Sequence, residues 1–150
     1  MIEQTKQMMS TMKFYGMLKS IDIRLHEASS NGWGATELIS ALVTDEKLYR
    51  DEQTMKRRLR LAQFRTDASL ERFDYTAKRN LTKAQVSELK SLKFLKDPRN
   101  VILMGPTGVG KTYLANAIGE HACREGYSAI FMGMNLFIEK TLMSRSDGSF

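Results

Sequence analysis

The residues with the clearest chemical potential form one run that ends in a lysine and a threonine. The run is Gly105-Pro106-Thr107-Gly108-Val109-Gly110-Lys111-Thr112, and it fits the phosphate-binding pattern G-x-x-x-x-G-K-[ST]. Glycines let the backbone curl so that N–H groups point at phosphate oxygens, and the lysine ammonium neutralises the β- and γ-phosphates. The hydroxyl after the lysine is a ligand for Mg²⁺. The run therefore predicts a nucleotide site in which Lys111 and Thr112 carry the chemistry.

The flanks of this run supply the strand and helix that such a loop requires. Residues 100–104, Asn-Val-Ile-Leu-Met, predict a short buried strand. Residues 111–124 predict a helix whose positive end faces the same anion. Its apolar face would consist of Leu114, Ala117, Ile118 and Ala122.

Beyond this helix, Gly126 is a good helix stop, residues 127–132 predict a second strand and residues 135–143 a second helix. The order strand, helix, strand, helix predicts an α/β domain with a parallel sheet.

Helical patterns dominate the region before the loop. Apolar residues at spacings of three and four predict helix over residues 2–29, where Gly16 indicates a bend or a break between two helices. Residues 29–32 predict a turn, and Thr36 is a candidate N-cap of the next helical region. Residues 45–52 are compatible with either a turn or an exposed helical segment.

The segment between the helical region and the loop is less regular. Residues 66–81 show no strong period and predict a linker with apolar anchors at Leu70, Phe73 and Tyr75. Thr82-Lys83-Ala84-Gln85 matches a capping box and predicts a helix start. Asp97-Pro98 predicts the end of that helix, because proline disfavours helical geometry in the residue before it.

The net charge of +6 is concentrated before the loop, because residues 101–150 hold four basic and four acidic residues. It is densest in residues 55–65, which contain no acid and five basic residues: Lys56, Arg57, Arg58, Arg60 and Arg65. Basic side chains clustered on one helix can neutralise several phosphates of nucleic acid. The alternative is a solvated helix face, or one paired with Asp51 and Glu52.

Composition excludes several other classes of protein. A single cysteine, Cys123, rules out an internal disulfide and a cysteine-rich zinc site, and fits a reducing cytoplasm. His26 and His121 are too few and too far apart in sequence to suggest a metal cluster. No apolar stretch approaches the roughly 20 residues that span a bilayer, so no membrane association is expected.

Residues 100–120 closely resemble the P-loop segment of IstB-type transposition helper ATPases, which are relatives of DnaC-type helicase loaders in the AAA+ superfamily. Residues 126–131, Gly-Tyr-Ser-Ala-Ile-Phe, resemble the second strand of that family. Residues 57–64 and 70–75 resemble its basic helix and linker. Tyr113 stands where a histidine is usual and Thr107 where a proline is common, but neither change removes a phosphate ligand.

The resemblance implies three regions: a helical DNA-binding domain at 1–66, a linker with a first helix at 67–99, and a partial AAA+ nucleotide-binding domain at 100–150. It implies binding of ATP and Mg²⁺, ATP-dependent oligomerisation on duplex DNA, and delivery of that DNA to a transposase. Phe73 and Tyr75 correspond to a linker segment that packs near the adenine; hydrophobic anchoring is the competing interpretation of both. The basic residues of segment 55–65 would hold the DNA backbone.

One part of an AAA+ site has no counterpart in the sequence. Such ATPases use a second acidic motif, four apolar residues followed by Asp and Glu, and nothing after Gly126 matches it. The sequence therefore predicts a truncated AAA+ domain with little ATP turnover. A helicase loader, a non-hydrolysing DNA-binding fragment and a P-loop small-molecule kinase are the alternative functions.

Overall fold

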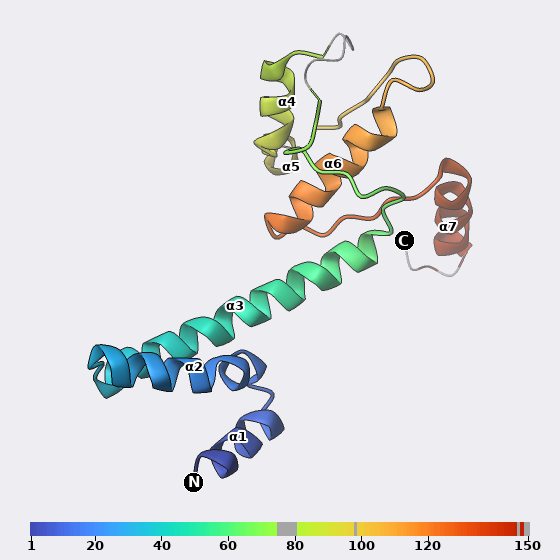
Figure 1. Ribbon diagram of the computed structural model, residues 1–150. Coiled ribbons are helices and arrows are strands. Elements are labelled where there is room, and N and C mark those ends of the chain that lie inside the picture. The colour runs from blue at the N-terminus through green and yellow to red at the C-terminus, as the bar shows by residue number, and fades with distance from the viewer. Residues whose placement is uncertain (75–80, 98, 147, 149–150) are drawn as a thin grey trace. The chain divides into compact units, whose positions relative to one another are not determined.

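A computed structural model of the protein describes residues 1–74, 81–97, 99–146 and 148. Within these residues the chain forms seven α-helices and no β-strand (Figure 1). It divides into two compact units, an N-terminal unit of residues 1–56 and a C-terminal unit of residues 57–150. Helix α3 (Ala35–Ala62) contributes residues to both units, because the boundary lies within it.

The N-terminal unit consists of helices α1 (Ile2–Thr11) and α2 (Tyr15–Asn31) and the first part of α3. The helix stop predicted within residues 29–32 is confirmed at its last position, because α2 continues to Asn31 and its C-cap Gly32 has a left-handed φ of 66°. Helix α3 begins at Ala35, so the proposed N-cap at Thr36 is wrong by a short margin. The helix also runs through residues 45–52, which are therefore helical and not a turn.

Gly16 was expected to interrupt the first helical pattern, and this prediction is wrong in position. The break lies just before it, around Lys13, whose φ is 60°. Gly16 itself lies in the first turn of α2, where a Cβ atom would come within 2.5 Å of the Glu46 Cα on α3. Glycine is thus needed there because two helix backbones approach closely.

The buried carboxylate of Glu46 secures this approach. It accepts hydrogen bonds from the backbone N–H groups of Gly16 (2.7 Å) and Met17 (3.2 Å) and from Arg50 Nε (2.7 Å). Burial favours the neutral acid, but these donors outweigh it and hold the pKa of Glu46 below its usual range. Two amides at the start of α2 thereby gain an acceptor that its own N-cap, Phe14, lacks in its side chain.

The C-terminal unit contains helices α4 (Lys83–Lys90), α5 (Lys93–Lys96), α6 (Lys111–Arg124) and α7 (Met134–Ser146). The capping box predicted at Thr82 is confirmed, since Gln85 N–H donates to the Thr82 hydroxyl and Thr82 N–H donates to the Gln85 side chain. Helix α4 packs against α5 and α6. Their apolar core consists of Ala68, Leu70, Phe73, Val86, Leu92, Leu114, Ala117, Ile118 and Ala122.

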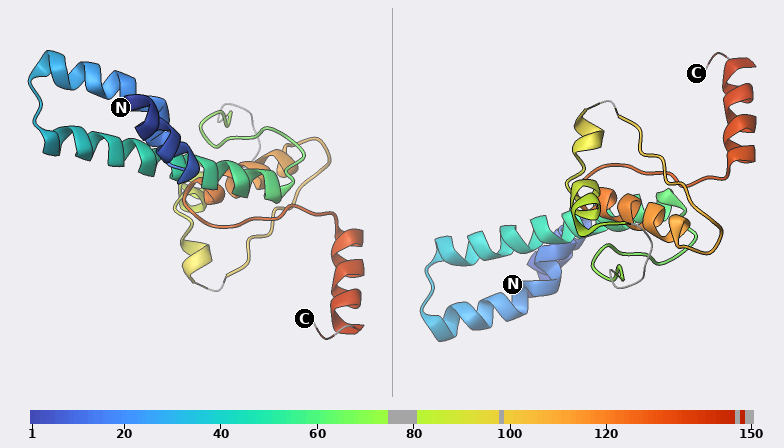
Figure 2. Two further views of the ribbon diagram at one scale, coloured as in Figure 1. Left: turned by 90° about the horizontal axis from the view of Figure 1, so that it is seen from below. Right: turned by 90° about the horizontal axis from the view of Figure 1, so that it is seen from above.

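The two predicted strands are not formed in the residues that the structure describes. Residues 101–106 and 127–133 have no regular secondary structure and appear as irregular coil in Figure 2. A strand requires ladder hydrogen bonds from a neighbouring strand, and no backbone bond joins these two segments among the described residues. Several of their apolar side chains are exposed, Ile102 by 76% and Ile130 by 67%, while Leu103 and Tyr127 pack against the core.

Candidate nucleotide-binding site

The glycine loop adopts a backbone that other residues rarely accept. Gly108 has a φ of 85° and Gly110 a φ of 93°, both in the left-handed region. The motif specifies glycine at position 110 but leaves position 108 free. The structure therefore adds Gly108 as a residue whose type the curl of the loop constrains.

The loop leads directly into α6. Gly110 is its N-cap and offers no side-chain acceptor to the first amides of the helix. The backbone N–H of Leu114 donates to Gly110 O (3.0 Å), which closes the first turn behind Lys111, Thr112 and Tyr113. The N–H groups before Leu114 are the unpaired donors of a helix start, and with the helix dipole they favour an anion.

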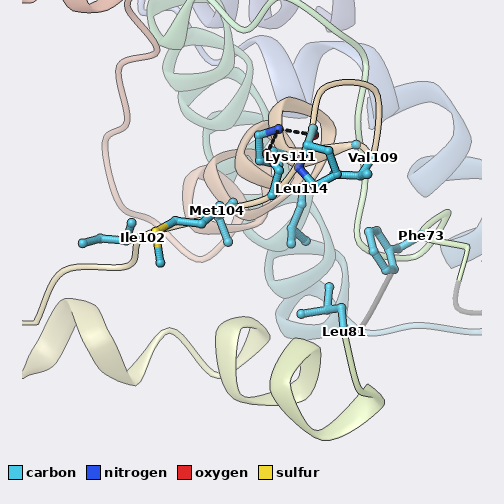
Figure 3. A pocket seen from close by; sticks show the side chains of 11 residues that line it. Phe73, Leu81, Ile102, Met104, Val109, Lys111 and Leu114 are labelled. Carbon is cyan, nitrogen blue, oxygen red and sulfur yellow. Dashed lines mark hydrogen bonds between the residues drawn. The ribbon is translucent and has the colours of Figure 1, made fainter. Parts of the chain in front are cut away.

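Lys111 folds back over the loop. Its ammonium donates hydrogen bonds to the carbonyl oxygens of Gly105 (2.8 Å) and Pro106 (2.6 Å), shown as dashed lines in Figure 3. A positive charge is thereby held inside the curl, beside the start of α6. Phosphate oxygens bound there would replace these two carbonyls as acceptors of the ammonium.

A cavity of about 420 Å³ opens beside the loop. Gly105, Pro106, Val109, Gly110 and Lys111 line its polar side. Its remaining wall is apolar and consists of Phe73, Leu81, Ile102, Leu103, Met104 and Leu114. Figure 3 shows the side chains of Phe73 and Leu81 on one side of the cavity and those of Ile102 and Met104 on the other. The cavity thus joins the curl of the glycine loop to an apolar chamber.

Three of the predicted loop residues do not line this cavity. Thr107 and Gly108 are exposed at the tip of the loop, and Thr112 is exposed in the first turn of α6. The Thr112 hydroxyl is therefore open to solvent at the position where the motif expects a Mg²⁺ ligand.

The two aromatic residues proposed near the base have different outcomes. Phe73 is 7% exposed, packs in the apolar core and also lines the cavity. Its ring lies 6.4 Å from that of Tyr113, measured between centroids. Phe73 therefore meets the requirements of both interpretations, anchor and cavity wall. Tyr75 lies outside the described residues.

The five basic residues of segment 55–65 have different surroundings. Lys56 Nζ pairs with Glu52 Oε1 at 2.7 Å, so the alternative of local pairing is correct for this residue. Arg57 and Arg60 are exposed. Arg58 is half-buried, and the guanidinium of Arg65 lies 5.6 Å from the centre of the Phe131 ring.

His121 and Cys123 are not among the residues that line the cavity. His121 Nε2 hydrogen bonds to Lys90 O (2.9 Å), and no cluster that could hold a metal ion occurs in the described part of the chain. Cys123 is fully buried on α6, and burial raises the pKa of its thiol. No helix among the described residues is long and apolar enough to cross a membrane.

Sequence reasoning missed a set of contacts that hold α6 in place. The Tyr113 hydroxyl donates to Ser69 O (3.3 Å) and accepts from Ser69 N–H (3.4 Å). Asn116 Nδ2 donates to the Thr66 hydroxyl (2.7 Å). Tyr113 was noted only as a departure from a family pattern, and no local signal in the sequence links it to Ser69, 44 residues away.

Several known proteins with similar sequences are named as insertion-sequence proteins. The chain is 40% identical over 116 residues to a protein of Mycobacterium tuberculosis named as ATP-binding in an insertion sequence, covering 77% of this chain and 46% of that protein. It is 30% identical over 151 residues to the corresponding IS1162 protein of Pseudomonas fluorescens, covering 100% of this chain and 65% of that protein. The IS21 protein of Pseudomonas aeruginosa is 28% identical over 146 residues, with coverages of 97% and 55%.

The chain thus spans about half to two thirds of the length of these relatives. The model of the family described as IstB-like ATP binding protein matches residues 7–150, nearly the whole chain. This family implies the AAA+ fold, whose sheet is not formed among the described residues. The match confirms the resemblance drawn from the loop: the chain belongs to the IstB-like ATP-binding family of insertion-sequence proteins.

Proposed function

We propose that the C-terminal unit binds ATP with its triphosphate in the curl of residues 105–112. The observation that carries this proposal is the Lys111 ammonium, held by two loop carbonyls at the start of a helix with no side-chain cap. Exchange of those carbonyls for β- and γ-phosphate oxygens is favourable because the new hydrogen bonds join opposite charges. Mg²⁺ would be held by the Thr112 hydroxyl together with phosphate oxygens.

The adenine would occupy the apolar chamber of the cavity. Phe73 and Leu81 form an apolar wall on one side of the chamber, and Leu114 also lines it. An aromatic side chain that is already packed in the core loses little entropy on contact with the base. Tyr75 remains a proposed contact of the same linker.

The exposed arginines of segment 55–65 would bind the phosphates of duplex DNA. Arg57 and Arg60 are exposed and form no ion pair with an acidic residue that the structure describes, whereas Lys56 would first have to leave Glu52. We propose that the protein assembles on DNA in an ATP-dependent oligomer and presents that DNA to the transposase of its insertion sequence. The relatives' association with insertion sequences supports this role.

Hydrolysis by this chain is expected to be slow. The sequence after Gly126 contains no apolar run followed by two acids, so it lacks the adjacent pair of carboxylates that would support the metal and polarise a water. Robust ATP turnover by the purified chain would contradict this part of the proposal.

Replacing Lys111 with alanine tests the nucleotide site. Isothermal titration calorimetry with ATP and Mg²⁺ should show a loss of affinity of at least about tenfold, because a charge-assisted contact of about 1.5–3 kcal/mol is removed. Lys140→Ala, at an exposed position on α7, is the matched control and should bind as the wild type does. Unchanged affinity in Lys111→Ala would refute the phosphate role.

Reversing the two exposed arginines, Arg57 and Arg60, to glutamate tests DNA binding. Affinity should fall for all duplex sequences alike, and the slope of log K against log salt should flatten by about 2, one for each lost phosphate contact. Reversing exposed Lys93 and Lys96 makes the same change in net charge elsewhere in the unit. A salt slope that stays unchanged would exclude these arginines as phosphate contacts.

A further inference from the structure

Residues 63–69, here called the strap, run alongside α6 in the opposite direction. Phe64 lies against Gly119, Thr66 bonds to Asn116, and Ser69 bonds to Tyr113. As the residue number increases along the strap, the number of the contacted residue on α6 decreases by a similar amount. The strap therefore follows the helix from its middle to its first turn.

The two ends of the strap lie at the two proposed binding sites. It begins directly after α3, whose last turns carry Arg57, Arg58 and Arg60. It ends at Ser69, which bonds to Tyr113, the residue after Lys111 and Thr112 on α6. All of these residues belong to the C-terminal unit.

The strap contacts the helix closely at Phe64, Thr66 and Ser69, while Gln63, Arg65 and Asp67 between them are exposed. A Cβ atom at Gly119 would lie 2.7 Å from the Phe64 ring, so the ring occupies the space that glycine leaves. Asn116 is 1% exposed, and its Nδ2 bonds to the Thr66 hydroxyl at 2.7 Å. Ala68, next to Ser69, is 2% exposed within the apolar core. Closely packed groups of this kind transmit a displacement because they have no space to absorb it.

The first turn of α6 is the part of the helix that phosphate would order. Amides of this turn would gain acceptors when the anion binds, which fixes the turn that carries Tyr113. Tyr113 contacts both backbone groups of Ser69, one as donor and one as acceptor. A change in the position or order of this turn is therefore passed to the strap backbone through two hydrogen bonds.

We propose that the strap links occupancy of the glycine loop to binding of the DNA backbone by the end of α3. This inference rests on the proposed function, since it needs both ligands. Thermodynamic linkage requires the effect to be reciprocal: nucleotide changes DNA affinity by the same factor as DNA changes nucleotide affinity. Typical coupling between sites is roughly 5- to 150-fold in affinity.

The test measures both binding constants, each with and without the other ligand. The probes are the non-hydrolysable analogue AMP-PNP with Mg²⁺ and a short duplex long enough for one protein. The wild type should show reciprocal coupling of at least about fivefold. Sedimentation of the same samples identifies the concentrations at which a single protein binds the short duplex, and the coupling is measured at those concentrations.

Tyr113→Phe removes the two hydrogen bonds to Ser69 and keeps the ring that packs near Phe73. Coupling should fall at least threefold toward unity, while the affinity for each ligand alone changes by less than about twofold. Thr66→Val, which removes the acceptor of Asn116 at nearly constant volume, should act in the same direction. Tyr127→Phe is the matched control: this half-buried tyrosine packs on the core without a hydrogen bond from its hydroxyl in the described structure.

The outcomes distinguish the coupling proposal from the proposed function. Binding of both ligands without coupling in the wild type overturns the coupling proposal and leaves the proposed function unaffected. Coupling that persists in both Tyr113→Phe and Thr66→Val also overturns it. Absence of nucleotide or DNA binding in the wild type overturns both proposals.

Discussion

The two units of the chain are stabilised by different kinds of contact. In the C-terminal unit, nine buried apolar residues form one cluster around α4 and α6. In the N-terminal unit Ile21 is the single buried large apolar side chain, and the buried polar residue Glu46 lies at the contact of α2 with α3. Arg24 binds both Asp45 oxygens, at 2.8 Å each, across the same two helices.

This difference shows that helical periodicity does not measure the size of a core. The N-terminal helices carry the regular apolar spacing of amphipathic helices, yet Ile23, Ile39 and Leu48 are exposed by about 60%. Their association depends on a close backbone approach and on oriented charges. The C-terminal unit should therefore respond most to loss of apolar volume, and the N-terminal unit to steric change at Gly16 and to pH.

The largest effect is expected from Leu70→Ala in the C-terminal unit. Leu70 is 2% exposed, and its truncation should cost about 2–5 kcal/mol of the free energy of unfolding of that unit. Hydrogen exchange measured by mass spectrometry should show faster exchange in α4 and α6, with α1 and α2 unchanged. Leu142→Ala, on exposed α7, should change stability by less than about 0.5 kcal/mol. An equal increase of hydrogen exchange in both units would contradict the proposed difference between them.

A smaller effect is expected from Gly16→Ala in the N-terminal unit. The added Cβ would meet backbone atoms, Glu46 Cα at 2.5 Å and Asp45 O at 2.6 Å, so the helices must separate at a cost of about 1–3 kcal/mol. Fluorescence of Trp33, the only tryptophan, reports on this unit. Gly34→Ala is the control, because its added Cβ would meet only the end of the flexible Glu37 side chain. A stable Gly16→Ala variant would show that this contact is not tight.

The smallest effect concerns the charge on Glu46. Because its pKa is lowered in the folded chain, its stabilisation is complete above the ordinary carboxyl range, near pH 4–5, and is lost as pH falls through the lowered pKa. The pKa of Asp45 is lowered too, chiefly by its hydrogen bonds from Arg24. On acidification the Trp33 signal should therefore change before exchange increases in α6.

Glu46→Gln sharpens this prediction. The variant keeps one acceptor oxygen but loses the charge, which should cost about 1–2 kcal/mol at neutral pH and make the acid transition of the N-terminal unit shallower. An acid transition identical to that of the wild type would exclude Glu46 as its source.

Features fixed by neighbours in sequence could be predicted, and features fixed by distant residues could not. The capping box at Thr82, the bounds of α6 and its buried face depend on contacts within a few residues, and the prediction for each is confirmed. The strands were inferred from apolar runs and, for the second strand, from a family resemblance, yet a strand exists only through a partner strand. Gly16 was recognised as unusual, but its reason is a helix 30 residues away.

The candidate site follows the same division. The glycine loop and its helix were predictable because the motif is contiguous. The apolar chamber was not, since it combines Phe73 and Leu81 with residues after position 100. The ion pair of Lys56 with Glu52 was foreseen only as an alternative, because a sequence does not state which exposed charges are already satisfied.

The burial of Cys123 makes its thiol a probe of local opening in the C-terminal unit. A thiol with no exposed surface reacts with an alkylating reagent only when the surrounding helix opens. Since the chain has no other cysteine, the rate at which its mass increases by one label measures that opening directly. Phosphate bound at the start of α6 should lower the rate at which Cys123 is labelled. Nucleotide affinity could therefore be measured from labelling rates alone.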